Sequence, residues 1–170
     1  MDKLLVTERL YLRHLTSADA FRIYAYRNHP KCSLYQHGQA RTLKEIETFI
    51  RTFQKSEFMS LEREQHYAIC SQDQTLVGEI AYFYTEADQC ITLGITIAED
   101  CHRQGYAYEI LKAIIASIQL QYPHLDIVAL IDKDNQPSIR LFEKLGFYQE
   151  AYAQSRHSYI YVIDGNKAPV

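Results

Sequence analysis

Several features that mark particular protein classes are missing from this chain of 170 residues. It contains no tryptophan, only six glycines and only four prolines, which excludes collagen-like and low-complexity compositions. No apolar run approaches the roughly 20 residues that a membrane helix needs. Charged residues at positions 2, 3, 8, 9 and 13 also interrupt the amino-terminal segment too early for a signal peptide. We therefore expect a cytoplasmic protein without a membrane partner.

Residue patterns for metal and nucleotide sites are absent as well. The four cysteines lie no closer than 11 residues apart, so no CxxC pair marks a zinc or redox site, and the seven histidines form no HExxH motif. Neither G-x-x-x-x-G-K-S/T nor G-x-G-x-x-G occurs, which argues against a P-loop NTPase or a Rossmann dinucleotide enzyme. We expect no metal ion, and we expect the cysteines to be core or surface residues rather than nucleophiles.

The composition that is present is typical of a packed globular domain. Hydrophobic residues make up 47% of the chain and charged residues 23%, and the formal net charge is −3. This balance supplies no basic field for nonspecific binding of nucleic acid, so we expect no nucleic-acid partner. The length corresponds to one domain. We place this domain at residues 1–164 and interpret residues 165–170 as a polar carboxy-terminal tail.

The first third of the chain predicts one strand and two helices. Leu10 and Leu12 alternate with less apolar neighbours, a period of two that predicts a strand half buried against a core. A T-x-x-D segment that begins at Thr16 predicts a helix start, and the helix continues to about Asn28 because a proline follows. Thr42 opens a capping box ahead of a second amphipathic helix.

The rest of the chain alternates between strands and helices. Apolar alternation predicts strands, whereas a 3.6-residue period with Pro-first and Gly-last signals predicts helices. The predicted strands span residues 66–70, 76–84, 90–97 and 126–131, with two short tyrosine-rich strands between 148 and 162. The predicted helices span residues 107–121 and 137–145. The fold class is therefore α/β, with about seven strands and about four helices.

One segment combines a strand, a basic turn that contains glycine and the start of the most regular helix. It runs CITLGITIAEDCHRQGYAYEILKAII from Cys90 to Ile115. A helix start presents N–H groups that lack intrahelical partners, together with the positive end of the helix dipole, so it can hold a phosphate group. Gly105 permits close approach of the backbone, and His102 and Arg103 add donors or charge. This turn is a candidate anion site.

Three segments resemble one family. HRQGYA at 102–107 resembles the acyl-CoA pyrophosphate loop of the GNAT superfamily of N-acetyltransferases, and DNQPSIRLFEKLGF at 134–147 resembles the second half of that family's signature. ERLYLRHLTSADA at 8–20 resembles the opening of the RimJ/RimL-like branch, whose members acetylate N-terminal or small-molecule amines. The resemblance spans nearly the whole chain.

The resemblance implies a mixed, mostly antiparallel sheet that is splayed between its fourth and fifth strands, with acetyl-CoA in the gap. The groups that would pair with the pantetheine arm are the main-chain groups of Leu93, Gly94, Ile95, Thr96 and Ile97. The pyrophosphate would lie on the turn formed by His102, Arg103, Gln104, Gly105, Tyr106 and Ala107. Asn135 would contact the cofactor or a water near the thioester, and the segment 29–41 would form one wall of the acceptor site.

Acetyl transfer requires a neutral amine, donors for the developing oxyanion and a proton for the departing thiolate. The oxyanion donor that the family implies is a backbone N–H of the fourth strand, at Ile95. Many members use a tyrosine of the last helix as the acid, but Phe142 stands at that position, and we predict that Ser138 takes its place. Glu79 lies inside the predicted strand 76–84, and we predict a catalytic or water-relay role for it. Thr92 stands where related enzymes often place a glutamate.

The predicted function is direct transfer of an acetyl group from acetyl-CoA, the acyl-donor cosubstrate, to a primary amine. The acceptor partner is a small-molecule amine or a protein N-terminus, and a homodimer is compatible with this activity. Two alternatives stay open at this point. One is a catalytically silent acyl-CoA-binding sensor, because Phe142 lacks a hydroxyl. The other is a dimeric interaction module in which the tyrosine-rich end strands pair with a partner.

Overall fold

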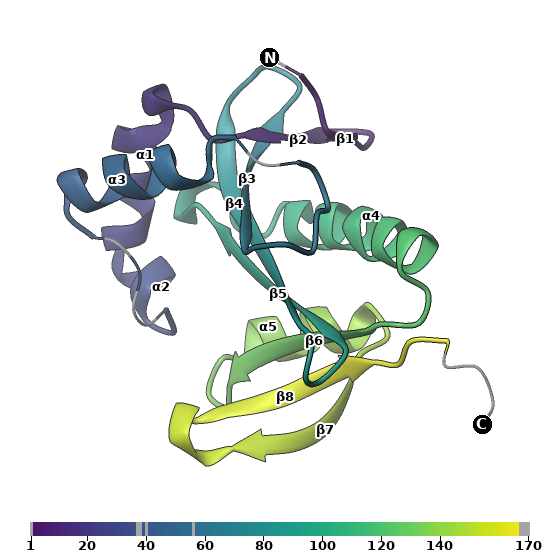
Figure 1. Ribbon diagram of the computed structural model, residues 1–170. Helices are drawn as coiled ribbons and strands as arrows, with labels where there is room; N and C mark the ends of the chain where they lie inside the picture. The colour runs from purple at the N-terminus through teal and green to yellow at the C-terminus, as the bar shows by residue number, and fades with distance from the viewer. Residues whose placement is uncertain (1, 37–38, 40, 56, 167–170) are drawn as a thin grey trace.

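The computed structural model describes residues 2–36, 39, 41–55 and 57–166, which form one mixed sheet with helices on both faces (Figure 1). The sheet of these residues has eight strands in the order β1-β2-β3-β4-β5-β6-β8-β7. The strands are β1 (Leu5–Val6), β2 (Leu10–His14), β3 (Gln65–Ser71), β4 (Leu76–Thr85), β5 (Cys90–Ile97), β6 (Asp126–Asp132), β7 (Tyr148–Ala153) and β8 (Ser158–Ile163). Neighbouring strands are antiparallel except β5 and β6, which are parallel.

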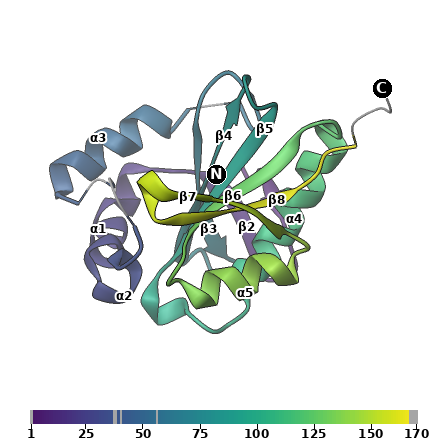
Figure 2. The ribbon, with the colours of Figure 1, turned by 90° about the horizontal axis from the view of Figure 1, so that it is seen from below.

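The described ranges contain five α-helices. They are α1 (Ala20–Asn28), α2 (Pro30–Ser33), α3 (Leu43–Phe53), α4 (Tyr106–Gln121) and α5 (Gln136–Lys144), with short 3-10 segments at Ser17–Asp19, Glu99–Cys101 and Gln154–Arg156. Figure 2 shows α1, α2 and α3 on one side of the sheet and α4 on the other. Of the helices that the structure describes, none is long and apolar enough to cross a membrane.

The predicted fold class is confirmed, and the strands predicted as fourth and fifth are β5 and β6. The structure adds β1 and α2, so the described residues hold eight strands and five α-helices instead of about seven and four. Both additions are too short to give a periodic signal, because β1 has two residues and α2 has four. α2 begins at Pro30, whose missing N–H suits the first position of a helix.

One layer of the core lies between the sheet and the apolar face of α4, and another lies under α1 and α3. Ile110, Leu111, Ile114 and Ile118 follow the spacing of one helix face and are fully buried. Burial of each side chain of this size stabilises the fold by about 1.5–3 kcal/mol. α4 contacts β2 and β5, so the core packing fixes the start of α4 beside the end of β5.

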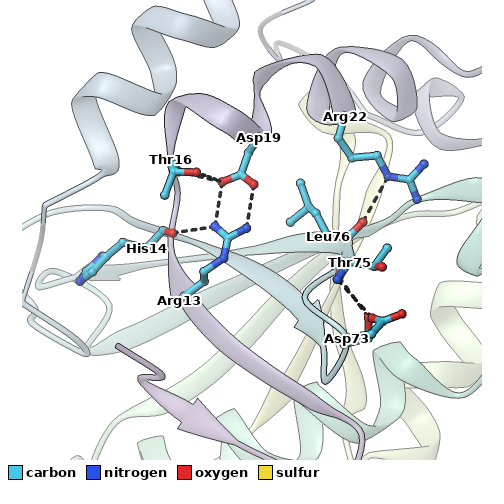
Figure 3. A network of polar contacts seen from close by, with 9 residues as sticks. Arg13, His14, Thr16, Asp19, Arg22, Asp73, Thr75 and Leu76 are labelled. Carbon is cyan, nitrogen blue, oxygen red and sulfur yellow. Dashed lines mark hydrogen bonds and ion pairs between the residues drawn. The ribbon is translucent and has the colours of Figure 1, made fainter. Parts of the chain in front are cut away.

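A buried ion pair joins β2 to the start of α1 (Figure 3). Arg13 donates from Nη1 and Nη2 to the carboxylate of Asp19 at 2.8 and 2.7 Å, and both side chains are buried. Asp19 also accepts a hydrogen bond from the backbone N–H of Thr16 at 2.7 Å. Further along α1, Arg22 donates from Nε to the carbonyl of Leu76 at 3.2 Å. These contacts hold α1 against the sheet.

The two parallel strands pair only over their first residues. Their register begins with Cys90 opposite Asp126 and ends with Thr92 opposite Val128, and no further pair joins them within the described chain. β5 then continues beside β4 as far as Ile97, whereas β6 continues beside β8. The strands therefore diverge, as Figure 1 shows. Backbone N–H and C=O groups on the facing edges beyond this point need other partners.

Candidate active site

A cavity of about 170 Å³ lies where β5 and β6 diverge. We call the part contributed by β5, β6 and α5 the strand wall; it includes Gly94, Ile95, Thr96, Asn135, Ser138 and Phe142. We call the part contributed by α1, β3, β4 and the segment after α2 the side-chain wall; it includes Arg27, Tyr35, His66, Glu79 and Ala81. The cavity thus brings together residues from both halves of the sheet.

Most of the predicted β5 positions line this cavity. Leu93, Gly94, Ile95 and Thr96 do so, whereas Ile97 lies just beyond it. A Cβ added to Gly94 would meet no atom within 4 Å, so the backbone there is open to a ligand. Because β6 has diverged at this level, the edge of β5 is suited to an extended ligand that carries amide groups.

The turn between β5 and α4 has a left-handed backbone at two positions. Arg103 has a φ of 58° and Gly105 a φ of 78°. Gly105 immediately precedes α4, whose first N–H groups have no acceptor inside the helix. The ring of His102 is turned back, with Nε2 2.8 Å from the carbonyl of Ile97. His102 therefore supports the turn, which is exposed from His102 to Gly105.

Arg9, near the amino terminus, forms hydrogen bonds to this turn and to α4. Its Nη1 donates to the carbonyl of Gln104 at 2.9 Å, and its Nε donates to Glu109 of α4 at 2.7 Å. The guanidinium also lies 4.9 Å from the ring centroid of Tyr106. Tyr106 and Ala107 form the first turn of α4. Sequence reasoning missed Arg9 because its partners lie almost 100 residues away along the chain.

The start of α5 supplies one hydroxyl of the strand wall, that of Ser138. Asn135 precedes the helix and accepts a hydrogen bond at Oδ1 from the backbone N–H of Ser138 at 3.3 Å. Ser138 is half-buried, and its own hydroxyl has no hydrogen-bond partner among the described residues. Phe142, one turn later, is buried against Phe147 with ring centroids 5.0 Å apart. Since a phenyl ring has no proton to donate, the hydroxyl that α5 offers here belongs to Ser138.

Glu79 lines the cavity in a buried ion pair that the sequence did not reveal. Arg27 of α1 donates from Nε and Nη2 to the two carboxylate oxygens of Glu79 at 2.7 and 2.6 Å. The two residues are 3% and 4% exposed. Both oxygens of Glu79 thus already accept charge-assisted hydrogen bonds. The partners are 52 residues apart, which is why no sequence motif connects them.

The segment after α2 spans the cavity. The hydroxyl of Tyr35 donates to the carbonyl of Asp134, in the loop before α5, at 3.2 Å. This contact joins the side-chain wall to the strand wall. Residues 37, 38 and 40 of the predicted acceptor segment 29–41 lie outside the described residues, as do residues 167–170 of the predicted tail.

Thr92 is separated from these groups. It lines a second cavity of about 500 Å³ over the first halves of β5 and β6, together with Phe83 and Asp126. Leu130 lines both cavities. The residue at the position where related enzymes often carry a glutamate therefore does not lie beside Ser138.

The cysteines stand apart from the first cavity. Cys32, Cys70, Cys90 and Cys101 are free and buried, and burial raises the pKa of each thiol above its ordinary value. Because the thiolate is the reactive form of cysteine, this burial suppresses their reactivity. The chemistry of the cavity is therefore that of its hydroxyl, carboxylate, guanidinium and imidazole groups.

Comparison with known proteins places the chain among acetyltransferases. The sequence model of the family described as "Acetyltransferase (GNAT) domain" matches residues 9–148. YoaA, an uncharacterized N-acetyltransferase of Bacillus subtilis (strain 168), is 26% identical over 153 residues, which cover 88% of this chain and 85% of YoaA.

Solved structures share the fold at low sequence identity. A spermidine N-acetyltransferase from Vibrio cholerae, in complex with CoA and spermine, superposes with a TM-score of 0.72 at 16% identity, covering 95% of this chain and 98% of that one. A ribosomal-protein-S5-alanine acetyltransferase from Vibrio fischeri superposes with a TM-score of 0.74 at 14% identity, covering 95% and 96%. The family match spans most of the chain, so this protein belongs to the GNAT family and is an acetyl-CoA-dependent N-acetyltransferase.

Proposed function

We propose that this enzyme transfers the acetyl group directly from acetyl-CoA to a primary amine of a small molecule or a protein N-terminus. The observation that carries the proposal is the cavity at the β5–β6 divergence, where Ser138 and the open edge of β5 face Arg27 and Glu79. One wall is suited to a thioester donor and the other to an amine acceptor. Direct transfer needs no enzyme nucleophile, which agrees with four buried cysteines.

The residues around the divergence fit acetyl-CoA. In the proposal, main-chain groups of residues 93–97 pair with the pantetheine arm, and the N–H groups of residues 103–107 hold the pyrophosphate at the start of α4. The cosubstrate supplies an activated acyl carbon and a thiolate leaving group. The N–H of Ile95 stabilises the negative charge that develops on the carbonyl oxygen.

Ser138 is the proposed proton donor to the departing thiolate. Its hydroxyl lines the cavity without another partner among the described residues. A thiol of this kind has a pKa of about 8.5, so protonation of the thiolate assists the reaction without being indispensable. Asn135 positions Ser138 through its hydrogen bond to the Ser138 backbone N–H, at 3.3 Å.

Glu79 is proposed to act on the acceptor electrostatically and through ordered water. Its two oxygens are engaged by Arg27, so a direct proton transfer from the amine would have to disrupt a buried pair. The pair instead presents a fixed dipole to the acceptor. In this role Glu79 does not itself take a proton from the amine, as a free carboxylate base would.

The acceptor class is proposed from two observations. The opening residues 8–20 resemble the RimJ/RimL-like branch, and one structural neighbour is named for a ribosomal-protein alanine. Another neighbour is named for spermidine and holds spermine. Both kinds of acceptor present a primary amine, which is the chemistry we assign. Family membership does not favour the silent sensor or the interaction module.

Assembly and location follow the same proposal. β7 is an edge strand with Tyr148 and Tyr152 exposed, so it is the surface on which we place a second copy in a homodimer. We also propose a cytoplasmic location, because the thiols that the structure describes are unpaired.

The test is a transfer assay over a defined panel of primary amines. The panel contains spermidine, a simple diamine, an aminoglycoside and peptides that begin with alanine or serine, each incubated with acetyl-CoA and the enzyme. Mass spectrometry is expected to detect a monoacetylated product whose formation requires the enzyme. Binding of acetyl-CoA without any acetylated product would refute amine transfer and favour the alternative of a catalytically silent acyl-CoA-binding sensor.

A further inference from the structure

One face of β6 is open along its whole length and has a regular composition. Ile127, Ala129 and Ile131 are buried, whereas the residues that alternate with them are half-buried or exposed. Because successive side chains of a strand point to opposite faces, these alternate residues share one face. They are, in chain order, Asp126, Val128, Leu130 and Asp132. A carboxylate thus stands at each end of a short apolar strip, and we call these four residues the β6 track.

The β6 track connects the two cavities. Asp126, Val128 and Leu130 line the second cavity, and Leu130 and Asp132 line the first. Leu130 is 37% exposed, and Phe83 of β4, which also lines the second cavity, is 39% exposed. Both side chains are therefore accessible to a ligand. The cavity of the proposed reaction thus continues along one face of the sheet into the second cavity.

The first cavity contains one carboxylate whose charge is not balanced. Arg27 and Glu79 form an ion pair, and His66 contacts Glu64. Asp132 forms no ion pair within the described part of the chain. It accepts one hydrogen bond, from the backbone N–H two residues later, at 2.9 Å. A carboxylate can accept several hydrogen bonds, so Asp132 retains capacity for a cationic donor.

The second cavity also favours a cation. Three carboxylates line it, those of Asp88, Asp126 and Glu150, against one guanidinium, that of Arg156. The formal charge of these four residues is therefore 1 − 3 = −2. Asp126 is half-buried and accepts a hydrogen bond at Oδ1 from the backbone N–H of Gly165 at 2.8 Å, which fixes its orientation. Negative charge at this end of the track is complementary to an ammonium group.

We propose that the β6 track binds the acceptor, and that the acceptor is an aliphatic amine with a second cationic group at the far end of its chain. This assignment rests on the proposed function, because it narrows the acceptor of that reaction. Asp132 attracts the reacting end into the first cavity. The methylene groups lie on Val128 and Leu130, and Asp126 binds the distal ammonium.

The apolar centre of the track favours a methylene chain over a peptide. The N–H and C=O groups of a peptide backbone need hydrogen-bond partners when they leave water. Val128 and Leu130 have no polar atoms in their side chains, so they cannot supply such partners. Methylene groups need none and gain free energy when they leave water. A peptide acceptor is therefore an outcome that the experiment must distinguish.

The spacing of the two carboxylates sets the length of the acceptor. Asp126 and Asp132 are six residues apart, which corresponds to about 20 Å along an extended strand. The two side chains and a hydrogen bond at each end take up part of this length. Roughly 10–14 Å then remain between the two nitrogens. An eight-carbon diamine falls in this range, whereas a four-carbon diamine is too short.

The kinetic test compares diamines with monoamines of the same chain length. The probes are 1,8-diaminooctane, n-octylamine, 1,4-diaminobutane and n-butylamine, each with wild type and saturating acetyl-CoA. After correction for its two equivalent amines, 1,8-diaminooctane is expected to have a kcat/KM about tenfold above that of n-octylamine. 1,4-Diaminobutane should have no comparable advantage over n-butylamine. The advantage should shrink at high ionic strength, because salt screens the distal charge pair.

Asp126→Asn tests the distal contact. The amide oxygen of asparagine can still accept the hydrogen bond from Gly165, but the negative charge is lost. This variant should raise KM for 1,8-diaminooctane toward that of n-octylamine and leave both constants for n-octylamine unchanged. Asp132→Asn should weaken both acceptors, because it lies at the reacting end. Glu47→Gln, in an exposed position on α3, is the control and should behave as wild type.

The outcomes separate this inference from the proposed function. If wild type acetylates n-octylamine as well as 1,8-diaminooctane, or if Asp126→Asn keeps the full advantage of the diamine, the inference fails and amine acetylation stands. Acetylation of an alanine or serine peptide in preference to every diamine would contradict it in the same way. If wild type binds acetyl-CoA but acetylates no amine, the proposed function fails, and the acceptor role of the track fails with it.

A binding test needs neither turnover nor a variant. Wild-type protein with ¹³C-labelled methyl groups is titrated with 1,8-diaminooctane in the presence of CoA. We expect chemical-shift changes at the methyl groups of Val128 and Leu130, and none at Val6, which is exposed on β1. Unchanged methyl signals of Val128 and Leu130 at millimolar diamine would overturn the assignment even if Asp126→Asn failed to fold.

Discussion

The strand wall of the cavity presents backbone groups of β5 and the start of α5, whereas the side-chain wall presents Arg27, His66 and Glu79. The strand wall is open because β6 diverges from β5 after Thr92. The side-chain wall is occupied by groups that already pair with one another or with neighbours. In the proposed reaction, the wall of backbone groups binds the constant arm of the cosubstrate, whereas the wall of paired side chains sets the charge that a particular acceptor meets.

This difference also separates stability from binding. The side-chain wall contains a buried ion pair, so its charged groups are coupled to folding. The turn between β5 and α4 is exposed, and it is held to the rest of the fold by the contacts of Arg9 and His102. Substitutions in the side-chain wall should therefore change the free energy of unfolding, whereas substitutions in the turn should change ligand affinity.

The largest effect is expected for Glu79→Gln in the side-chain wall. The buried guanidinium of Arg27 would lose its carboxylate, which should lower the free energy of unfolding by about 3–5 kcal/mol. Urea denaturation measures this loss, and Glu86→Gln in the exposed β4–β5 turn is the matched control. Acetyl-CoA affinity of the folded variant should stay near wild type. A loss of stability below about 1 kcal/mol, the usual range for a surface pair, would contradict the account.

The next effect is expected for Gly105→Glu in the turn that we propose to hold the pyrophosphate. At a φ of 78° any Cβ is strained, and the new carboxylate would repel the pyrophosphate. Together these effects should weaken acetyl-CoA binding about 100-fold, which corresponds to about 2.7 kcal/mol. Gly105→Ala adds the backbone strain without the negative charge, so it should lose less acetyl-CoA affinity than Gly105→Glu. Unchanged acetyl-CoA affinity in folded Gly105→Glu would remove this turn from the binding site.

A smaller effect is expected for Ser138→Ala in the strand wall. Loss of the proton donor should lower kcat about tenfold and leave KM nearly unchanged, because the hydroxyl acts on the leaving group rather than on bound acceptor. Steady-state kinetics separates the two constants, and Ser138→Thr should recover part of kcat. An unchanged kcat in Ser138→Ala would leave Ser138 as a helix residue without a role in proton transfer.

The smallest effect is expected for Arg9→Ala. The side chain is 47% exposed, and exposed ion pairs contribute at most about 1 kcal/mol. Acetyl-CoA affinity should fall about two- to fivefold, because the carbonyl of Gln104 loses its hydrogen bond from Arg9 and the turn is held less firmly. Calorimetry of Arg9→Ala beside Lys112→Ala, an exposed control on α4, measures the difference. A loss as large as that of Gly105→Glu would mean that Arg9 binds the ligand itself.

Elements with a long periodic pattern were predictable from the sequence. The apolar face of α4 and the capping box at Thr42 both appear where their patterns predicted them. β1 and α2 were not predicted, because their lengths of two and four residues are too short to show a periodic pattern. Gly105 was identified from the sequence as a position of close backbone approach, and the structure adds that its φ is positive, a conformation that glycine favours.

The side-chain wall was not predictable to the same degree. Glu79 was identified as a polar residue in a strand, but its pairing with Arg27 depends on how α1 packs across the sheet. His66 is one of seven histidines, and its sequence context does not distinguish it from the others. What distinguishes it is the place it takes beside Phe49 and Glu64 once α3 covers β3. Contacts of this kind join distant segments, so local pattern carries no information about them.

The most direct test of the account is calorimetric titration of the purified protein with acetyl-CoA, with ATP and NAD as controls. The backbone-lined divergence of β5 and β6 predicts that acetyl-CoA alone binds, with micromolar or tighter affinity, about −8 kcal/mol or better. Absence of acetyl-CoA binding, or equal binding of all three ligands, would contradict the assignment of the strand wall as the cosubstrate site.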